Sequence, residues 1–401
     1  MGLAEQFAWT SGGRIISALV QAVTYLLIAR DAGPQLFAAV AVAIGLATVL
    51  QSIFDLGIST YLVKERALNP DSVYVHAGLL VNRFASGGLL IFSSLLLLGA
   101  GVILNPDYIS LVPLALWVAG DRFIETRLGL AIADGKAHIA STNLFLRRTI
   151  SLSIYLLVTF CGVPPLAAVS ASFSASTLIS LICMPKLKYS VLSGERNQRA
   201  LIRDVIRLSR PFWFNSVATQ VRNIDTLVVS GVGGLTTGGL YGLVARAIGP
   251  LRILSTSLSA VLLPAASRAG GSSLSHLRRS VGVLIVSLAV FYSLIVVIVP
   301  YVVPAFLGSA YEGAVFPMQI VIGSLIFASV ASLLNAVLQA TGREWYVAHV
   351  SATTSLLTLL LCGLGAVVAG AVGAAIGVAV TFVVQALALL HVYYKKDNKF
   401  E

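Results

Sequence analysis

The stretch WTSGGRIISALVQAVTYLLIAR (residues 9–30) is an apolar run of the length that one helix needs to cross a bilayer. It contains Arg14, and an arginine that faces lipid at mid-helix costs about 2.5–3.5 kcal/mol on insertion scales. Such a residue is therefore expected to face a protein interior or a wet cavity. Further runs of this kind follow at residues 36–58, 77–103, 109–132, 143–162, 164–185, 211–232, 237–263, 281–303, 314–340, 346–368 and 370–394.

The composition agrees with a chain that crosses the membrane many times. Hydrophobic residues make up 57% of the 401 residues and charged residues only 11%, whereas a soluble protein has about 25% charged residues. Residues 1–8 lack the basic segment of a cleavable signal peptide, so the first helix is expected to be retained. Cys161, Cys183 and Cys362 lie in apolar runs without metal-ligand spacing, and we expect no metal site, disulfide framework or cofactor.

The distribution of basic residues indicates the orientation of the chain. Most of the 27 lysines and arginines fall in connections after even-numbered runs or after the last run, whereas connections after odd-numbered runs hold only Arg30. The positive-inside rule then places both termini in the cytoplasm. The net charge of +11 is interpreted as this topology signal, and no nucleic-acid partner is expected.

The longest polar stretch, residues 186–210, divides the chain almost in half. We expect an N-terminal six-helix bundle over residues 1–185 and a C-terminal six-helix bundle over residues 211–394, followed by a cytoplasmic tail over residues 395–401. Apolar residues between Leu201 and Leu208 alternate with arginines, which predicts a short amphipathic helix within the cytoplasmic linker 186–210.

Two pairs of matching segments indicate an internal repeat. Residues 133–136 (ADGK) correspond to residues 340–343 (ATGR), about 207 positions later. The second pair consists of two polar helix faces about 201 positions apart, Arg14, Ser17, Gln21 and Tyr25 against Asn215, Thr219, Arg222 and Thr226. The sequence predicts an all-α fold of twelve transmembrane helices in two six-helix bundles. Because each offset spans an even number of helices, the two halves are expected to share the same orientation. A pseudo-two-fold axis along the membrane normal would relate the bundles around a central cavity.

Several stretches, in order along the chain, carry a resemblance to a known family. They are Leu27 to Arg66 with its Gly-Pro-x-x-Phe turn and Asp55-Leu56-Gly57, Arg210-Pro211-Phe212-Trp213, Asn223-Ile224-Asp225, Gly239 to Arg246, Leu263 to Ser267 and Leu338 to Arg343. Together they resemble the multidrug/oligosaccharidyl-lipid/polysaccharide (MOP) exporter superfamily, and most of all its polysaccharide-type, Wzx-like flippases. The chain is more compact than many members of that family, which often have longer loops or additional helices.

The resemblance implies an alternating-access transporter in the bacterial inner membrane. Its substrate would be a lipid-linked oligosaccharide, a short glycan on undecaprenyl pyrophosphate, destined for O-antigen, capsule or exopolysaccharide. Membrane lipids, a polysaccharide polymerase and a chain-length regulator are the partners that it implies. No motif identifies the sugar.

The charged residues inside the apolar runs fit such a substrate, because arginines outnumber acids there and guanidinium groups bind phosphate bidentately. The residues expected to bind the pyrophosphate or glycan are Arg14, Gln21, Arg122, Arg222, Arg246 and Arg252. The candidates for ion coupling or for a switch are Asp121, Glu125 and Asp225. Each of these groups has a structural alternative, such as the ion pair that Arg222 and Asp225 could form three residues apart. Arg83, Arg147 and Arg148, near helix starts, are expected to snorkel to the cytoplasmic interface.

Three other functions are considered. An ion-coupled multidrug exporter of the same superfamily should show an excess of embedded acids, not arginines. A major-facilitator transporter should carry a Gly-x-x-x-Asp-Arg-type motif after the second helix, and residues 62–70 do not. An enzyme of the same glycan pathway would need long external loops with reactive groups, and the odd-numbered connections are only about ten residues long. We therefore expect no catalytic residues.

Overall fold

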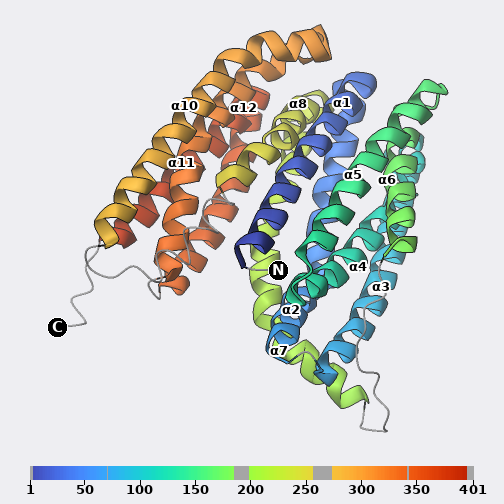
Figure 1. Cartoon of the computed structure of the whole chain (residues 1–401). Coiled ribbons are helices and arrows are strands. Elements are labelled where there is room, and N and C mark those ends of the chain that lie inside the picture. Colours follow the sequence, from blue (N-terminus) through green and yellow to red (C-terminus); the bar gives the residue numbers. More distant parts are fainter. Residues whose placement is uncertain (1–2, 70, 185–197, 256–272, 341–342, 395–401) are drawn as a thin grey trace. The chain divides into compact units, whose positions relative to one another are not determined.

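The computed structural model describes residues 3–69, 71–184, 198–255, 273–340 and 343–394 (Figure 1). In these ranges all the regular structure is helical. The predicted tail 395–401 and most of the predicted linker, residues 186–197, lie outside the described residues. Seven described segments are long and apolar enough to cross a membrane, so the chain is a multi-pass membrane protein.

Three of these seven segments, residues 11–55, 198–255 and 345–394, contain 45, 58 and 50 residues, whereas one crossing needs about 20. Each contains a break in helical geometry, at Gly33, Gly234 and Ala369–Gly370 respectively. Helix α4 carries four charged residues and α5 two adjacent arginines, and neither belongs to the seven. The predicted arrangement of twelve helices in two bundles, with boundaries at residues 185 and 211, stays a prediction.

The chain forms two compact units, each made of two segments. The first unit contains residues 1–24 and 43–223, and the second contains residues 25–42 and 224–401. Helix α1 (Leu3–Asp55) contributes to both units. The other elements of the first unit are α2 (Ile58–Leu68), α3 (Val73–Ile103), η1 (Pro106–Leu111), α4 (Leu114–Ala133), α5 (Ala137–Phe160), α6 (Pro165–Ile182), α7 (Gln198–Gln220) and most of the 3-10 turn η2 (Val221–Ile224). The second unit contains α8 (Asp225–Ala247), α10 (Ser273–Leu307), η3 (Ser309–Ala314), α11 (Val315–Ala340) and α12 (Glu344–Tyr394).

Breaks in the backbone repeat at the offsets expected from the sequence. Gly33 in α1 has φ 68° and ψ 170°, and Gly234 in α8 has φ 83° and ψ 166°, 201 positions later. Both conformations have positive φ, which glycine adopts without the penalty of a Cβ atom. The short helices η1 and η3 lie 203 positions apart and contain six residues each. These matches support the internal repeat, although two residues of its 340–343 segment, 341 and 342, lie outside the described part.

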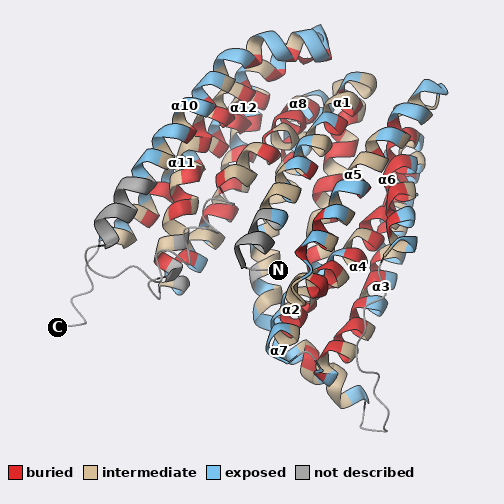
Figure 2. Ribbon diagram, in the orientation of Figure 1, coloured by how far each residue is buried: buried red, intermediate tan, exposed pale blue. Residues whose placement is uncertain are grey.

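In the first unit α4, α5 and α6 pack side by side, with α3 against α4 (Figure 1). Exposed residues run along the length of α3 (Figure 2), as expected for a helix with one face toward lipid. The packed helices place the charged side chains of α4 and α5 against each other, and these side chains form the site described below.

Helix α7 lies across the ends of α2 and α3 and covers part of their apolar surface. Its Val205 is fully buried in a cluster with Ile58, Leu62 and Val75. At the start of α2, a Cβ atom on Gly57 would lie 2.3 Å from the carbonyl oxygen of Ser209, so only glycine permits this close approach of backbones.

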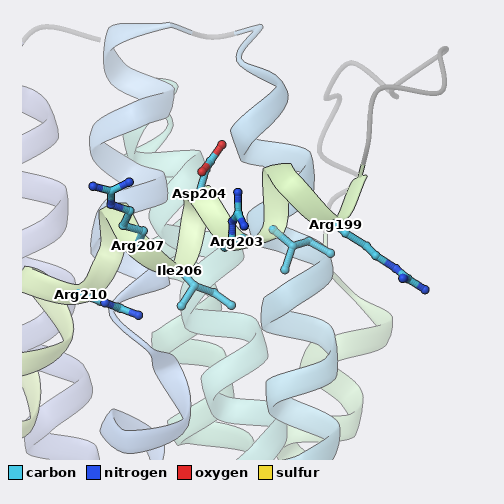
Figure 3. Close-up of a pocket in the computed structure, with 7 residues that line it drawn as sticks. Arg199, Arg203, Asp204, Ile206, Arg207 and Arg210 are labelled. Carbon is cyan, nitrogen blue, oxygen red and sulfur yellow. The ribbon is translucent and has the colours of Figure 1, made fainter.

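The opposite face of α7 is basic. Figure 3 shows its side chains around a shallow pocket, and the arginines among them are exposed. The lining residues are Arg199, Ile202, Arg203, Asp204, Ile206, Arg207 and Arg210. The stretch between residues 201 and 210 is therefore helical and amphipathic, and it belongs to a helix of 23 residues.

In the second unit, residues 25–42 of α1 pack against α8 and η3. A Cβ atom on Gly239 would lie 1.8 Å from the carbonyl oxygen of Pro34, so the two backbones touch there. The hydroxyl of Tyr311 donates to the carbonyl oxygen of Ala29 at 2.9 Å. Helices α8, α11 and α12 pack side by side, and α10 packs on α11 (Figure 1). A segment from the beginning of the chain thus completes the second unit.

Candidate functional site

The centre of the first unit holds a cluster of charged side chains on α4 and α5. Asp121 and Glu125 lie one turn apart on α4 and therefore point to the same side of the helix. Arg147 of α5 binds both, with Nη1 2.7 Å from Asp121 Oδ1 and Nη2 2.6 Å from Glu125 Oε1. The side chain of Arg147 is only 1% exposed. One buried guanidinium thus holds two carboxylates.

This arrangement corrects one expectation. Arg147 was expected to snorkel to the interface, but it is buried against two acids because α5 packs on α4. The two carboxylates needed a neighbouring cation, and the sequence offered no means of choosing Arg147 over Arg148, which is half-buried beside it. Arg83, the third residue of that group, is exposed on α3.

A second ion pair lies beside the first. Arg122 of α4 pairs with Asp55 at the end of α1 and also donates to the hydroxyl of Ser59 on α2. Ser59 donates to Asp55 Oδ1 at 2.6 Å, and its hydroxyl lies 2.6 Å from that of Thr126. Thr126 in turn donates to Asn82 Oδ1 on α3 at 3.2 Å.

The hydroxyl and amide groups of this network were not predicted. No pattern in the sequence distinguishes Ser59, Thr126 and Asn82 from other polar residues. The residue that could have indicated them is Asp55, a carboxylate within an apolar run, which requires hydrogen-bond donors around it. Four helices, α1 to α4, are connected through these side chains.

A cavity of about 480 Å³ opens beside the two ion pairs. Its charged lining residues are Arg14 from α1 and Arg122 and Glu125 from α4. Ser59, Thr60 and Ser141 add hydroxyl groups. Arg122 and Glu125 are engaged in ion pairs, whereas Arg14 is exposed and forms no ion pair with the described residues. The cavity therefore offers one guanidinium whose charge no carboxylate of the described chain neutralises.

An apolar groove of about 450 Å³ lies next to this cavity, between residues 9–16 of α1 and residues 141–145 of α5. Ser141 of α5 lines both the cavity and the groove. The groove is otherwise lined by Trp9, Gly12, Gly13, Ile16, Thr142 and Phe145.

Three of the predicted site residues lie in the second unit. Asp225 begins α8, where its carboxylate accepts from the backbone N–H of Thr226 at 2.6 Å and from the hydroxyl of Tyr241 at 2.8 Å. Arg246 donates to the carbonyl oxygen of Ala41 at 2.8 Å, and Arg252 lies over the ring of Phe382, 5.9 Å from its centroid.

The remaining two, Gln21 and Arg222, lie in the first unit. Gln21 is half-buried on α1, two turns after Arg14, and is not among the described residues that line the cavity. Arg222 is half-buried in η2. A 3-10 turn, η2, interrupts the expected seventh helix between Arg222 and Asp225. Within the first unit, the structure brings together Arg14, Arg122, Asp121 and Glu125.

Comparison with known sequences identifies the chain's relatives. A family described as polysaccharide biosynthesis protein matches residues 3–269, about two thirds of the chain. The chain belongs to this family. No curated protein matches this family member in sequence.

Solved structures reveal the fold of this family member. An inward-facing multidrug resistance MATE family transporter of the MOP superfamily is similar with a TM-score of 0.68 and 15% identity, covering 98% of this chain and 94% of that one. An outward-facing MATE transporter gives 0.65 at 15% identity over 96% and 94%. A MOP superfamily transporter from Pyrococcus furiosus, reported to have a binding pocket of reverse polarity, gives 0.66 at 15% identity over 96% and 94%. The family member therefore has the fold of MOP superfamily transporters.

Proposed function

We propose that this protein is a flippase that moves a polyprenyl-pyrophosphate-linked oligosaccharide repeat unit across the bacterial inner membrane by alternating access. The unit would serve the synthesis of O-antigen, capsule or exopolysaccharide. Family membership supports a role in polysaccharide biosynthesis, and the fold supports transport. The observation that carries the proposal is the cavity of the first unit, where Arg14 has no carboxylate partner among the described residues and Arg122 lies on the same lining.

The chemistry of this cavity suits a pyrophosphate that carries sugars. Arg14 would bind the phosphate oxygens, and Arg122 could add a second guanidinium while it keeps Asp55. Glu125 is 45% exposed although it is paired with Arg147, so it retains oxygens that can accept from sugar hydroxyls. The hydroxyls of Ser59, Thr60 and Ser141 supply further hydrogen-bonding groups for a glycan.

Asp225 is the proposed coupling residue of the second unit, because it is a carboxylate within an apolar part of the chain, where it accepts from two hydroxyls and one N–H. Asp121 and Glu125 are proposed as a switch, because both carboxylates share the guanidinium of Arg147 and Glu125 also lines the cavity beside Arg122. Gln21, Arg222, Arg246 and Arg252 are proposed as further substrate contacts during the cycle. Both termini are proposed to be cytoplasmic, and a polymerase and a chain-length regulator are the proposed partners.

The proposal is tested by deleting the protein in its host and measuring surface polysaccharide together with undecaprenyl-linked intermediates. Re-expressed wild type should restore polymer, and Arg14→Gln should leave lipid-linked units trapped on the cytoplasmic side. Arg83→Gln is the matched control, because Arg83 is also exposed on an apolar helix of the first unit but does not line the cavity. Normal polysaccharide with altered drug tolerance in the deletion strain would refute the proposal and favour a multidrug exporter.

A further inference from the structure

We infer that the apolar groove between α1 and α5 binds the isoprenoid chain of the substrate while its pyrophosphate occupies the adjacent cavity. This inference rests on the proposed function and adds to it a second subsite with a different chemistry. The isoprenoid chain would lie in the groove, in contact with the bilayer, while the head group is inside the protein.

The groove is built from one stripe of α1 and one stripe of α5. Trp9, Gly12 or Gly13, and Ile16 recur every three to four residues and therefore share one face of α1. The aromatic and aliphatic side chains stay on the outside, since Trp9 is 47%, Ile16 52% and Phe145 38% exposed. In a membrane protein such a surface faces lipid chains.

Two adjacent glycines give the groove its depth. A Cβ atom on Gly13 would lie 2.6 Å from Cβ of Ser141, so α1 and α5 approach closely at this point. A hydrogen bond stabilises the same contact, because Ser141 Oγ donates to the carbonyl oxygen of Trp9 at 2.7 Å. Gly12, by contrast, has no atom within 4 Å of its ideal Cβ position and therefore borders open space.

The neighbouring cavity indicates what occupies the groove. Ser141 lines both spaces, and Arg14 of the cavity follows directly after Gly13 of the groove. A ligand that spans them must be anionic at one end and apolar at the other. Ordinary phospholipids share that description, so competition by a phospholipid distinguishes the two kinds of ligand.

The free energy that an isoprenoid gains by binding in the groove is expected to come from packing. Lipid chains are as apolar as the side chains of the groove, so moving an isoprenoid from the bilayer into it gives no hydrophobic driving force. Van der Waals contact with a preformed surface remains, and it favours the ligand whose shape fits. We therefore expect a moderate change in affinity when the groove is filled, and none for a ligand without a chain.

Gly12→Leu is the variant that fills the groove. Its side chain would enter open space, and leucine has a higher helix propensity than glycine, so folding is not threatened. Gly87→Leu is the matched control, because Gly87 on α3 of the same unit also has no atom within 4 Å of its ideal Cβ position. Arg14→Gln removes the cavity guanidinium and leaves the groove intact.

The experiment measures binding of undecaprenyl pyrophosphate, dioleoyl phosphatidic acid and inorganic pyrophosphate to the full chain in nanodiscs of neutral lipid. Gly12→Leu should weaken binding of undecaprenyl pyrophosphate about five-fold or more and leave inorganic pyrophosphate unchanged, while Gly87→Leu changes neither. Unchanged affinity of Gly12→Leu for undecaprenyl pyrophosphate would overturn the inference. Equal competition by dioleoyl phosphatidic acid would also overturn it, because the groove would then accept any lipid chain.

The outcomes separate this inference from the proposed function. If wild type binds inorganic pyrophosphate and Arg14→Gln does not, the head-group site stands whatever Gly12→Leu shows. If no pyrophosphate ligand binds wild type, the proposed function itself fails. A photoreactive benzophenone at the end of a short isoprenoid pyrophosphate adds a direct readout, since its adducts should fall on residues 9–16 and 141–145. Adducts elsewhere would refute the placement of the chain.

Discussion

Replacing Arg147 by methionine should be among the most destabilising changes in the first unit. The side chain is 1% exposed and lies within 2.7 Å of oxygens from two carboxylates, Asp121 and Glu125. Methionine fills similar space but leaves both acids without their cation. Removing one partner from a buried ion pair typically costs about 3–5 kcal/mol. For a unit of this size, that corresponds to a fall in melting temperature of roughly 6–20 °C.

The assay is thermal unfolding of detergent-purified protein, followed as loss of the monodisperse peak in size-exclusion chromatography. The triple variant Arg147→Met, Asp121→Asn, Glu125→Gln separates the causes, because it removes the charges that would be left unpaired. It should recover a large part of the lost stability. Arg148→Met, at the half-buried neighbouring position, is the control and should shift the melting temperature little. A single variant as stable as wild type, or a triple variant no better than the single, would refute the reasoning.

Three further predictions concern other contacts. Gly239→Ala should strongly destabilise the second unit, because its Cβ atom would lie 1.8 Å from the carbonyl oxygen of Pro34; a melting temperature equal to wild type would contradict this contact. Asp134→Asn should cost about 1.5–3 kcal/mol in chemical unfolding, because Asp134 accepts two hydrogen bonds of 2.7 and 3.1 Å from Arg66 and the two side chains are only 20% and 13% exposed. The same hydrogen bonds raise the pKa of Arg66, and a loss below about 0.5 kcal/mol would contradict the prediction. Cys362 is buried, whereas the two other cysteines are exposed. In a variant with those two replaced by serine, maleimide should therefore label Cys362 only when the protein unfolds. Rapid labelling of folded protein would contradict this prediction, because it would show that the thiol is accessible.

Much of the fold followed from the spacing of apolar runs and of special residues. The helical class and the multi-pass character required only run length and composition, and the glycine turns after residues 30 and 230 have matching backbone angles in the structure. Arg14, which a polar helix face suggested, lines a cavity of the first unit, and its role in binding stays a prediction. For the helical class and the glycine turns, a local pattern was sufficient.

The partners of the embedded charges could not be predicted in this way. Arg147 and Asp121 are 26 positions apart, and only the packing of α5 on α4 decides that they meet. Arg246 stays a predicted phosphate ligand, and the sequence did not indicate that its guanidinium donates to the backbone of Ala41, which is 205 positions away. Sequence shows that a buried charge needs a partner, whereas tertiary packing selects it.

The division of the chain into units has a consequence for its biosynthesis. Residues 25–42 are made early, yet the elements that they pack against in the second unit begin only at residue 224. In the same way, the first unit is complete only when residues 198–223 have been made. Cutting the chain before α7 would thus yield two fragments, neither of which contains a whole unit, and each would depend on the other fragment to finish folding.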